Sequence, residues 1–414
     1  MKNGKKIILV LLIIVFCFIG FIGRAIYMEF TTSKKDRVNE YVDVTTDIEE
    51  EEYIDEELEE IPEIPEEPKF SSINILAVGD IMFHSPQYRA AFNKETNSYD
   101  FTPTFRHVKR YVEEADIALG NFETVTAGEG VSFSGFPRFN TPKESLLALK
   151  ETGFDILSTA NNHCIDQGKK GLISTIDNIN EYKMKNIGTY KEPGDNILIE
   201  ERDGIKIGFL SYTYGLNGLD SLLKAEELAY MVNRIDEEKI KEDIEKLKSL
   251  DVDLITVFIH WGNEYQREPS TYQLELGSKM VEWGANIILG SHPHVIQKSQ
   301  IINKDGKDNF IIYSMGNFLS NQRKETMNNP YTEDGVMINL EIEKNLNSNE
   351  TIIKSVQYIP TWVHRFRDSN GKLSYEIIPI NDYINGELDI AIAGSLKERI
   401  MKSYNDTMGK MIEN

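Results

Sequence analysis

The chain beyond residue 70 alternates short apolar runs with segments of helical periodicity. Runs rich in Ile, Leu, Val and Phe occupy residues 71–78, 115–119, 154–159, 252–259 and 285–289. Between these runs, apolar side chains recur three or four positions apart over residues 143–152, 172–185, 236–250 and 272–283. This is the spacing of an amphipathic helix. Buried strands that alternate with such helices predict an α/β protein with a layered sheet.

Other patterns complete the predicted domain. Asp203-Gly204 separates two apolar runs within residues 196–212, as in a β-hairpin. The remaining predicted elements are an alternating strand at 334–342, β-like runs at 352–359 and 373–380, and a helix at 388–411. We therefore expect a main domain over residues 71–345, followed over residues 346–414 by a β extension and a closing helix.

The N-terminal segment predicts a membrane anchor. Residues 7–23 are seventeen apolar or glycine residues, preceded by Lys2, Lys5 and Lys6. A spanning helix needs about 17–25 such residues, and the lysines favour a cytoplasmic N-terminus. No A-x-A-like site follows, so an uncleaved anchor within residues 1–30 is favoured over a cleaved signal peptide. A lipoprotein anchor at Cys17 is disfavoured because Phe16 precedes it. We expect a single-pass protein of the cell membrane with its C-terminal domain extracellular.

Charge separates a linker from the rest of the chain. The 414 residues carry a formal net charge of −22, and residues 43–67 alone hold 14 Asp or Glu and no Lys or Arg. Removing these 14 charges leaves −8. Such a segment repels itself, so residues 31–70 are expected to be an extended, disordered acidic linker. A net-acidic chain is also a poor nucleic-acid binder. The two cysteines exclude a disulfide framework and a Cys-based zinc site.

Side chains that can bind a metal or move a proton come directly after the predicted strands. They are Asp80, Glu123, Asn162, His163, His260, His292 and His294. In open α/β sheets, ligands bind at the carboxyl ends of the strands. We therefore expect these side chains to converge on one edge of the fold.

The predicted convergence suits a site with two metal ions. Imidazole and carboxylate groups favour Mn, Fe, Zn or Ni over Ca or Mg. Two divalent ions roughly 3.5–4 Å apart would activate a water and clamp the oxygens of a displacement. Glu123 offers two oxygens to bridge them, and the turn His292-Pro293-His294 reaches two neighbouring ions. His163 is placed to protonate a leaving group, and Asp166 is near enough in sequence to orient it.

Several residues near these strand ends are candidates for substrate contact. They are His84, Asn121, Trp261, Glu264 and Asn317. Trp261 either lines the same pocket or packs in the core, and both interpretations stay open. Arg89 and Arg138 are cations that either neutralise a polyanion or are simply solvated. Cys164 is disfavoured as a nucleophile because no second histidine–acid pair accompanies it.

Six short motifs give the chain a family resemblance. GDIMFH, GNFET, ANNHCIDQG, HWGNEY, GSHPHVIQ and YSMGNF, in this order over roughly residues 73–320, are similar to the CapA family of bacterial poly-γ-glutamate capsule synthesis. The domain of that family is similar to the calcineurin-like metallophosphoesterases, which implies a layered α/β/β/α fold. The resemblance implies Asp80 and His294 at one ion, Asn162, His260 and His292 at the other, and Glu123 between them. It also implies His163 as the general acid.

Two positions depart from the phosphoesterase pattern. That family has D-x-H in its first motif, whereas His84 lies four residues after Asp80, and its bridging residue is an Asp where GNFET offers Glu123. We expect a dinuclear-metal hydrolase-type site, with Mn, Fe or Zn, that acts in the synthesis, export or anchoring of a poly-γ-glutamate-type polymer. The expected partners are the membrane, capsule synthase or export subunits and an anionic polymer. The alternatives are a non-catalytic scaffold of a synthase complex and a general extracellular phosphoesterase.

Overall fold

The computed structural model describes residues 68–411, apart from 129, 195–196 and 391. These residues belong to one compact unit, residues 66–414. The predicted anchor at residues 7–23 and nearly all of the predicted linker lie outside the described residues. Among the residues that are described, no helix combines the length and apolar character needed to cross a membrane.

The larger of two main sheets is mixed. Its order is β16-β15-β14-β1-β4-β5-β6, and β13 pairs with the end of β1. Its strands are β1 (Phe70–Ile81), β4 (Ile117–Phe122), β5 (Ile156–Ser158), β6 (Lys185–Ile187), β13 (Asn317–Leu319), β14 (Asp334–Asn345), β15 (Glu350–Arg367) and β16 (Leu373–Pro379). β1, β4, β5 and β6 are parallel, whereas β14 to β16 are antiparallel to their neighbours. The carboxyl ends of the parallel strands therefore share one edge.

The smaller sheet has the order β11-β12-β10-β9-β8-β7. Its strands are β7 (Leu198–Arg202), β8 (Ile205–Thr213), β9 (Leu254–His260), β10 (Ile287–Ser291), β11 (Ser299–Lys304) and β12 (Lys307–Ile312). β8, β9, β10 and β12 run parallel, and the outer two strands are antiparallel. A separate two-stranded ribbon pairs β2 (Phe92–Asn93) with β3 (Ser98–Tyr99).

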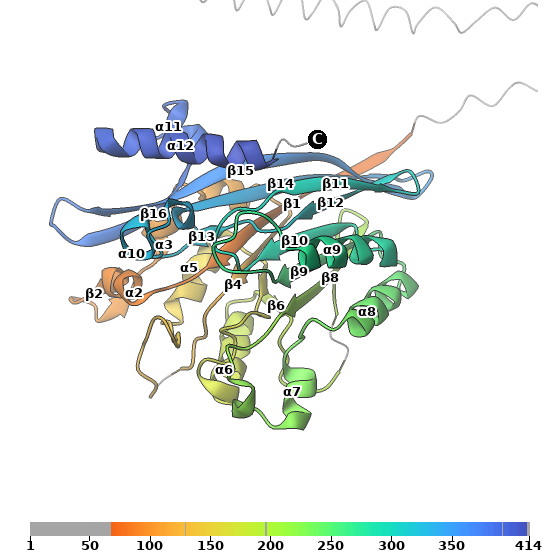
Figure 1. The fold of residues 1–414 in the computed structure, drawn as a ribbon, viewed down its shortest axis with the longest axis horizontal. Helices are drawn as coiled ribbons and strands as arrows, with labels where there is room; N and C mark the ends of the chain where they lie inside the picture. The colour runs from red at the N-terminus through yellow and green to blue at the C-terminus, as the bar shows by residue number, and fades with distance from the viewer. Residues whose placement is uncertain (1–67, 129, 195–196, 391, 412–414) are drawn as a thin grey trace, which may run out of the picture. The chain divides into compact units, whose positions relative to one another are not determined.

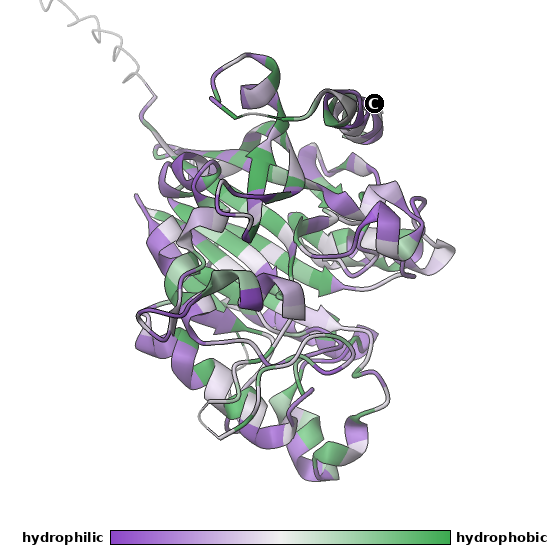
Figure 2. Ribbon diagram, turned by 90° about the vertical axis from the view of Figure 1, so that its left-hand side faces the viewer, coloured by the Kyte–Doolittle hydropathy of each residue, from purple (hydrophilic) through white to green (hydrophobic). Residues whose placement is uncertain are grey.

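The two main sheets pack face to face through a shared apolar core. Ile75 and Leu119 of the larger sheet and Phe209 and Phe258 of the smaller are fully buried in one cluster. Figure 2 shows the interior strands coloured mostly as hydrophobic, with polar residues along the surrounding helices and loops. Burial of apolar area of this kind is the main favourable contribution to folding.

Helices cover the outer faces, so the layers run α/β/β/α (Figure 1). Those on the larger sheet are α2 (Ser85–Ala91), α3 (Thr102–Phe105), α4 (Lys109–Glu113), α5 (Glu144–Thr152) and α6 (Gly168–Glu181). Those on the smaller sheet are α8 (Glu237–Ser249) and α9 (Thr271–Trp283). α7 (Ala225–Met231) packs beside α6. α12 (Gly394–Met411) packs on Trp362 of β15, and α10 (Lys324–Met327) and α11 (Ile380–Ile384) are short.

The predicted elements are confirmed in type, and the structure differs from the predictions in some element ends and in the pairing of strands. The hairpin is present, and Asp203 and Gly204 both have positive φ in its turn. The helix expected from residue 388 begins at Gly394. The strand ends that were expected to share one edge come from two separate sheets. Periodicity reports which face of an element is buried, but it does not report which strands pair.

A buried hydrogen bond links the two sheets and gives a testable contribution to stability. The hydroxyl oxygens of Ser158 on β5 and Ser211 on β8 are 2.8 Å apart, and both residues are buried. Ser158→Ala leaves the Ser211 hydroxyl without this partner, which costs about 1–3 kcal/mol of unfolding free energy. The double variant Ser158→Ala/Ser211→Ala is expected to lose less than the two single losses combined. Urea denaturation measures all three, and additive losses would contradict the link.

Candidate metal centre

A close backbone approach positions Asp80 at the end of β1. A Cβ on the preceding Gly79 would lie 2.0 Å from the carbonyl oxygen of Gly316, so only glycine fits. The register of β1 against β4 shifts at this point, and the amide of Asp80 donates to the same carbonyl at 3.0 Å. Its fully buried carboxylate is thereby fixed between the two sheets' ends.

Asn121 orients the two buried carboxylates from the end of β4. Its Nδ2 is 2.8 Å from Oδ1 of Asp80 and 3.1 Å from Oε2 of Glu123. Asn161 Nδ2 in turn donates to Asn121 Oδ1 at 3.1 Å. These bonds leave Oε1 of Glu123 as a fully buried oxygen without a hydrogen-bond partner in the described protein.

His260 ends β9 and faces the same point from the other sheet. Its Nε2 lies 3.1 Å from Oδ1 of Asn162 and 3.6 Å from Oε1 of Glu123. Its Nδ1 lies 2.9 Å from the hydroxyl of Ser291. A second polar partner of this kind sets ring orientation in metal-binding histidines.

The turn after β10 directs two imidazoles into the site. His292 and His294 have φ values of 98° and 57°, which are unusual for non-glycine residues. Nδ1 of His294 is 2.9 Å from Oδ2 of Asp80, and its Nε2 is 3.8 Å from Oε1 of Glu123. Nδ1 of His292 is buried without a hydrogen-bond partner. Strained backbone of this kind persists where the surroundings over-determine it, as at functional sites.

The structure therefore brings together all six side chains that the resemblance assigned to metals. We call them the histidine–carboxylate cluster: Asp80, Glu123, Asn162, His260, His292 and His294. Two groups of three have ligand atoms within 4.8 Å of one another, Glu123–His292–His294 and Asp80–Glu123–His260, and they share Glu123. This grouping differs from the pairing that the resemblance implies, whereas the direct contacts of Asp80 with His294 and of Asn162 with His260 agree with it.

Burial sets the charge of the cluster. Desolvation lowers the pKa of His292 to about 3 and holds that of His260 well below its usual range. Both rings are therefore neutral and able to coordinate. Desolvation and the nearby Asp80 raise the pKa of Glu123 well above its usual value. Burial also opposes ionisation of Asp80, but the hydrogen bond and charge of His294 lower its pKa overall. A bound cation would offset these desolvation costs, so the donor set and its orphaned atoms fit a metal.

His163 and Asp166 form a buried pair beside the cluster. Nδ1 of His163 is 2.8 Å from Oδ2 of Asp166, and that oxygen also accepts from the amide of Phe139 at 2.6 Å. The Phe139 ring packs edge-on against His163, with centroids 4.8 Å apart. Arg138 donates through Nε to the backbone carbonyl of Asp166 at 2.6 Å. The orientation of the imidazole is thus fixed by the hydrogen bond at Nδ1.

The structure separates the weaker candidates. Oδ1 of Asn317 lies 3.1 Å from Nδ1 of His294. Burial lowers the pKa of His84 to about 4, helped by the charges of His294 and His163 and opposed by the hydrogen bond with Gln87. Glu264 is exposed, yet its charge contributes to the raised pKa of Glu123. Of the two interpretations of Trp261, the structure supports packing in the core. Its side chain is fully buried in one apolar cluster with residues of α8 and α9, and its Nε1 donates to the Tyr313 carbonyl at 2.9 Å.

Cys164 is also excluded as a nucleophile by its surroundings. It is buried in the apolar cluster of α6 and α7, and burial raises the pKa of its thiol to about 12. The thiolate, which is the nucleophilic form, is therefore scarce at neutral pH.

The sequence patterns did not point to three residues of the site. Ser291 and Asn161 hold His260 and Asn121 through the bonds above, and the ring of Tyr214 packs 4.4 Å from that of His292. Tyr214 Oη also lies 3.4 Å from Nδ2 of Asn162. Tyr214 directly follows β8, so the strand-end rule that found the histidines would have found it too.

Comparison with known sequences adds a family match. A family model described as bacterial capsule synthesis protein PGA_cap matches residues 74–322. "Capsule biosynthesis protein CapA" of Bacillus anthracis is 32% identical over 260 residues, which cover 60% of this chain and 60% of that protein. "PGA biosynthesis protein CapA" of Bacillus subtilis (strain 168) is 28% identical over 273 residues, covering 65% and 67%. The chain thus spans less than two thirds of the first relative's length.

Two solved structures show a distant likeness. A phosphatase from Mycoplasma pneumoniae has 15% identity and a TM-score of 0.42, covering 70% of this chain and 94% of that one. The calcineurin-like phosphoesterase YfkN from Bacillus subtilis has 15% identity and a TM-score of 0.40, covering 82% and 99%. Both scores are low, and neither likeness supports an argument about activity.

Proposed function

Because the chain belongs to the family of bacterial capsule synthesis proteins, we propose that it is a metal-dependent hydrolase-type protein of capsule biosynthesis. It would act in the synthesis, export or anchoring of an extracellular polymer of the poly-γ-glutamate type. The observation that carries the proposal is Oε1 of Glu123, a buried, unpartnered carboxylate oxygen 3.6 Å and 3.8 Å from Nε2 of His260 and of His294. Such an arrangement is costly without a cation.

The cluster has the donors for two divalent transition-metal ions. Asp80 and His294 would hold one ion, Asn162, His260 and His292 the other, and Glu123 would be shared. Mn, Fe and Zn suit this mixture of imidazole, carboxylate and amide oxygen. Bound there, the ions would supply Lewis-acid activation of water and of the scissile group.

The protein's own proton donor is His163. The Asp166 carboxylate accepts from Nδ1, which fixes the ring and leaves Nε2 to carry a proton to a departing group. Phe139 and Arg138 also hold this pair in place through the contacts described above. His163 is 4% exposed, so proton exchange with bulk water is restricted.

A groove next to this pair suits an anionic chain. It has a volume of about 500 Å³ and is lined by Ser85, Tyr88, Arg89, Phe133, Ser134, Gly135, Phe136, Pro137, Arg138 and Gln167. This lining contains two arginines and no carboxylate, although the chain as a whole carries −22. Phe136 is 74% exposed at its rim. Local cations of this kind attract a polyanion and guide it toward a site.

A substitution at Arg89 tests whether the groove binds an anionic chain. Within the described residues Arg89 is exposed and no ion pair of it is found, so Arg89→Glu is expected to weaken binding of poly-γ-glutamate about tenfold at low salt. The difference should shrink as salt rises, because exposed charges are screened. Lys307→Glu makes the same charge change on β12, outside the groove, and serves as the control. Equal losses in both variants by calorimetry would contradict a role for the groove.

We also propose that residues 7–23 anchor the protein in the membrane with the folded unit outside. The support is the uninterrupted apolar run after three lysines. Protease treatment of intact cells should remove the folded unit. Its protection in intact cells, with cleavage only after lysis, would contradict this topology.

The proposed function is tested by metal analysis and turnover together. The purified chain, loaded separately with Mn, Fe and Zn, is assayed on phosphodiesters, phosphomonoesters and γ-glutamyl amides. His292→Ala should lose metal and turnover together. Retained metal without turnover of any substrate would favour a scaffold in a synthase complex. Turnover of simple phosphodiesters alone would favour a general phosphoesterase.

A further inference from the structure

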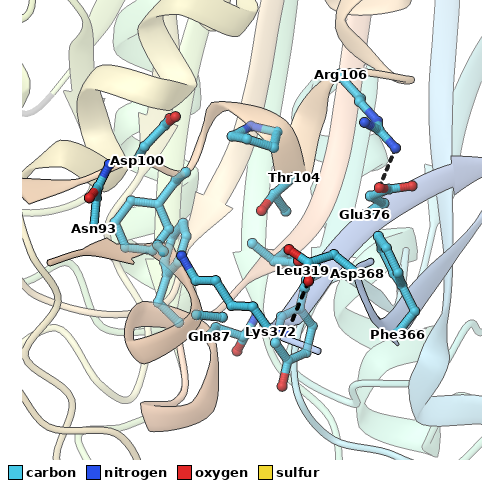
Figure 3. Close-up of a pocket in the computed structure, with 17 residues that line it drawn as sticks. Gln87, Asn93, Asp100, Thr104, Arg106, Leu319, Phe366, Asp368, Lys372 and Glu376 are labelled. Carbon is cyan, nitrogen blue, oxygen red and sulfur yellow. Dashed lines mark hydrogen bonds and ion pairs between the residues drawn. The ribbon is translucent and has the colours of Figure 1, made fainter. Parts of the chain in front are cut away.

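A second cavity lies away from the histidine–carboxylate cluster, between α2–α3 and the ends of β15 and β16 (Figure 3). Its volume is about 390 Å³, and none of the six proposed metal ligands lines it. One wall comes from residues 83–106 and the other from residues 366–376. The second wall lies beyond the family match at residues 74–322.

The floor of the cavity combines aromatic rings with an unsatisfied amide. Phe83, Phe101 and Tyr375 line it and are at most 5% exposed. Gln87 is 4% exposed, and its Oε1 accepts from the amide of His84 at 2.7 Å. Its Nε2 is buried without a hydrogen-bond partner. A buried amide without an acceptor is destabilising, and an acceptor on a ligand would remove that cost.

The mouth of the cavity carries charges of both signs. Lys372 is exposed, and its ammonium donates to the Phe92 carbonyl at 3.1 Å. Asp100 and Asp368 each use Oδ1 to accept from backbone amides of their own turns. No hydrogen bond or ion pair of their Oδ2 atoms is found within the described residues. Both oxygens are therefore open to a donor on a ligand.

The remaining charges at the mouth neutralise one another. Arg106 pairs with Glu376, and the same carboxylate lies 3.1 Å from Nε2 of His107. These partners lower the pKa of Glu376 against the opposing effect of burial. Two carboxylates and one ammonium are left for a ligand. That balance disfavours a polyanion, in contrast to the acid-free groove beside His163.

We propose that this cavity binds a small zwitterion, namely an α-amino acid or a dipeptide with an apolar side chain. Its carboxylate or carbonyl would accept from Lys372 or from Gln87 Nε2, and its ammonium would donate to Asp368 or to Asp100, all of which line the cavity. Its side chain would lie against the aromatic floor. Ligand sites commonly combine apolar walls with a few placed polar groups in this way. The site goes beyond the proposed function and does not depend on it.

Calorimetric titration of the purified full chain with free L- and D-amino acids, dipeptides and their N-acetylated or amidated forms tests the proposal. At least one free zwitterion should bind with a Kd below about 1 mM, and blocking either charged end should weaken it at least tenfold. Free amino acids and dipeptides form separate arms, so the panel identifies which of them the cavity takes.

Two variants keep the test decisive. Lys372→Met removes the ammonium, and Gln87→Glu keeps the acceptor for His84 but removes the buried donor; each should weaken binding at least tenfold. Lys307→Met on β12 is the matched control and should bind normally. Lys372→Met should retain full metal content, which separates this site from the cluster. Absence of any binding zwitterion, or normal binding by Lys372→Met, would overturn the proposal.

Discussion

Glu123→Gln is expected to abolish stable metal binding at both proposed positions. Glu123 is the residue shared by the two groups of potential ligands, and its Oε1 is the buried oxygen that lacks a protein partner. A glutamine offers only one weak oxygen ligand and no negative charge. The metal content measured by elemental analysis after dialysis should fall from two ions per chain to none. The stabilisation that metal gives the native protein, about 4 kcal/mol at a thousand times Kd, should disappear with it.

The same substitution should act in the opposite direction on the metal-free protein. Since burial raises the pKa of Glu123, the folded state opposes its ionisation, and this destabilises the fold as pH rises above the carboxylate's unfolded value. A neutral amide removes that penalty, so metal-free Glu123→Gln should melt above the metal-free native protein at pH 7. Glu200→Gln, which alters a buried glutamate paired with Lys185, is the control. Full metal content in Glu123→Gln would refute the shared-ligand role.

His163→Asn is expected to lower turnover about 10²- to 10⁴-fold while metal content stays unchanged. The residue is not among the proposed ligands, and its ring is held by Asp166 in the orientation of a proton donor. The loss should depend on the leaving group. A nitrophenolate leaves without a proton, so the variant should retain more activity on its ester than on an alkyl ester. Steady-state kinetics on such a matched pair measures this dependence.

The controls separate proton transfer from structural damage. Asp166→Asn keeps the shape of the pair but weakens the hold on Nδ1, so its loss should be smaller than that of His163→Asn. His107→Asn changes a histidine in the α3–α4 connection that contacts Glu376, and it should leave turnover unchanged. Equal losses on both leaving groups would argue against His163 as the general acid.

Local patterns were sufficient to predict most of the fold. The alternating run at 334–342 became β14, with its apolar residues Ile338, Leu340 and Ile342 fully buried. The stripe Ile240, Ile244 and Leu247 became the buried face of α8. These predictions succeed because one buried face imposes its period on the residues of a strand or helix. The C-terminal helix was predicted to start at residue 388 but starts at Gly394. Element ends are harder to predict because they depend on weaker local signals.

The predictions about the site succeeded or failed for the same physical reason. By itself the sequence determined which residues are candidate ligands, their positions at strand ends and the departures at His84 and Glu123, since each is a property of a few consecutive residues. Only the tertiary structure decided that ends of two different sheets meet at Glu123, and that Ser291, Asn161 and Tyr214 support them. The tertiary structure also placed Trp261 in the core and brought residues 83–106 and 366–376 together around one cavity. Contacts between segments this far apart in the chain depend on how sheets and helices pack, and no local pattern of residues encodes that packing.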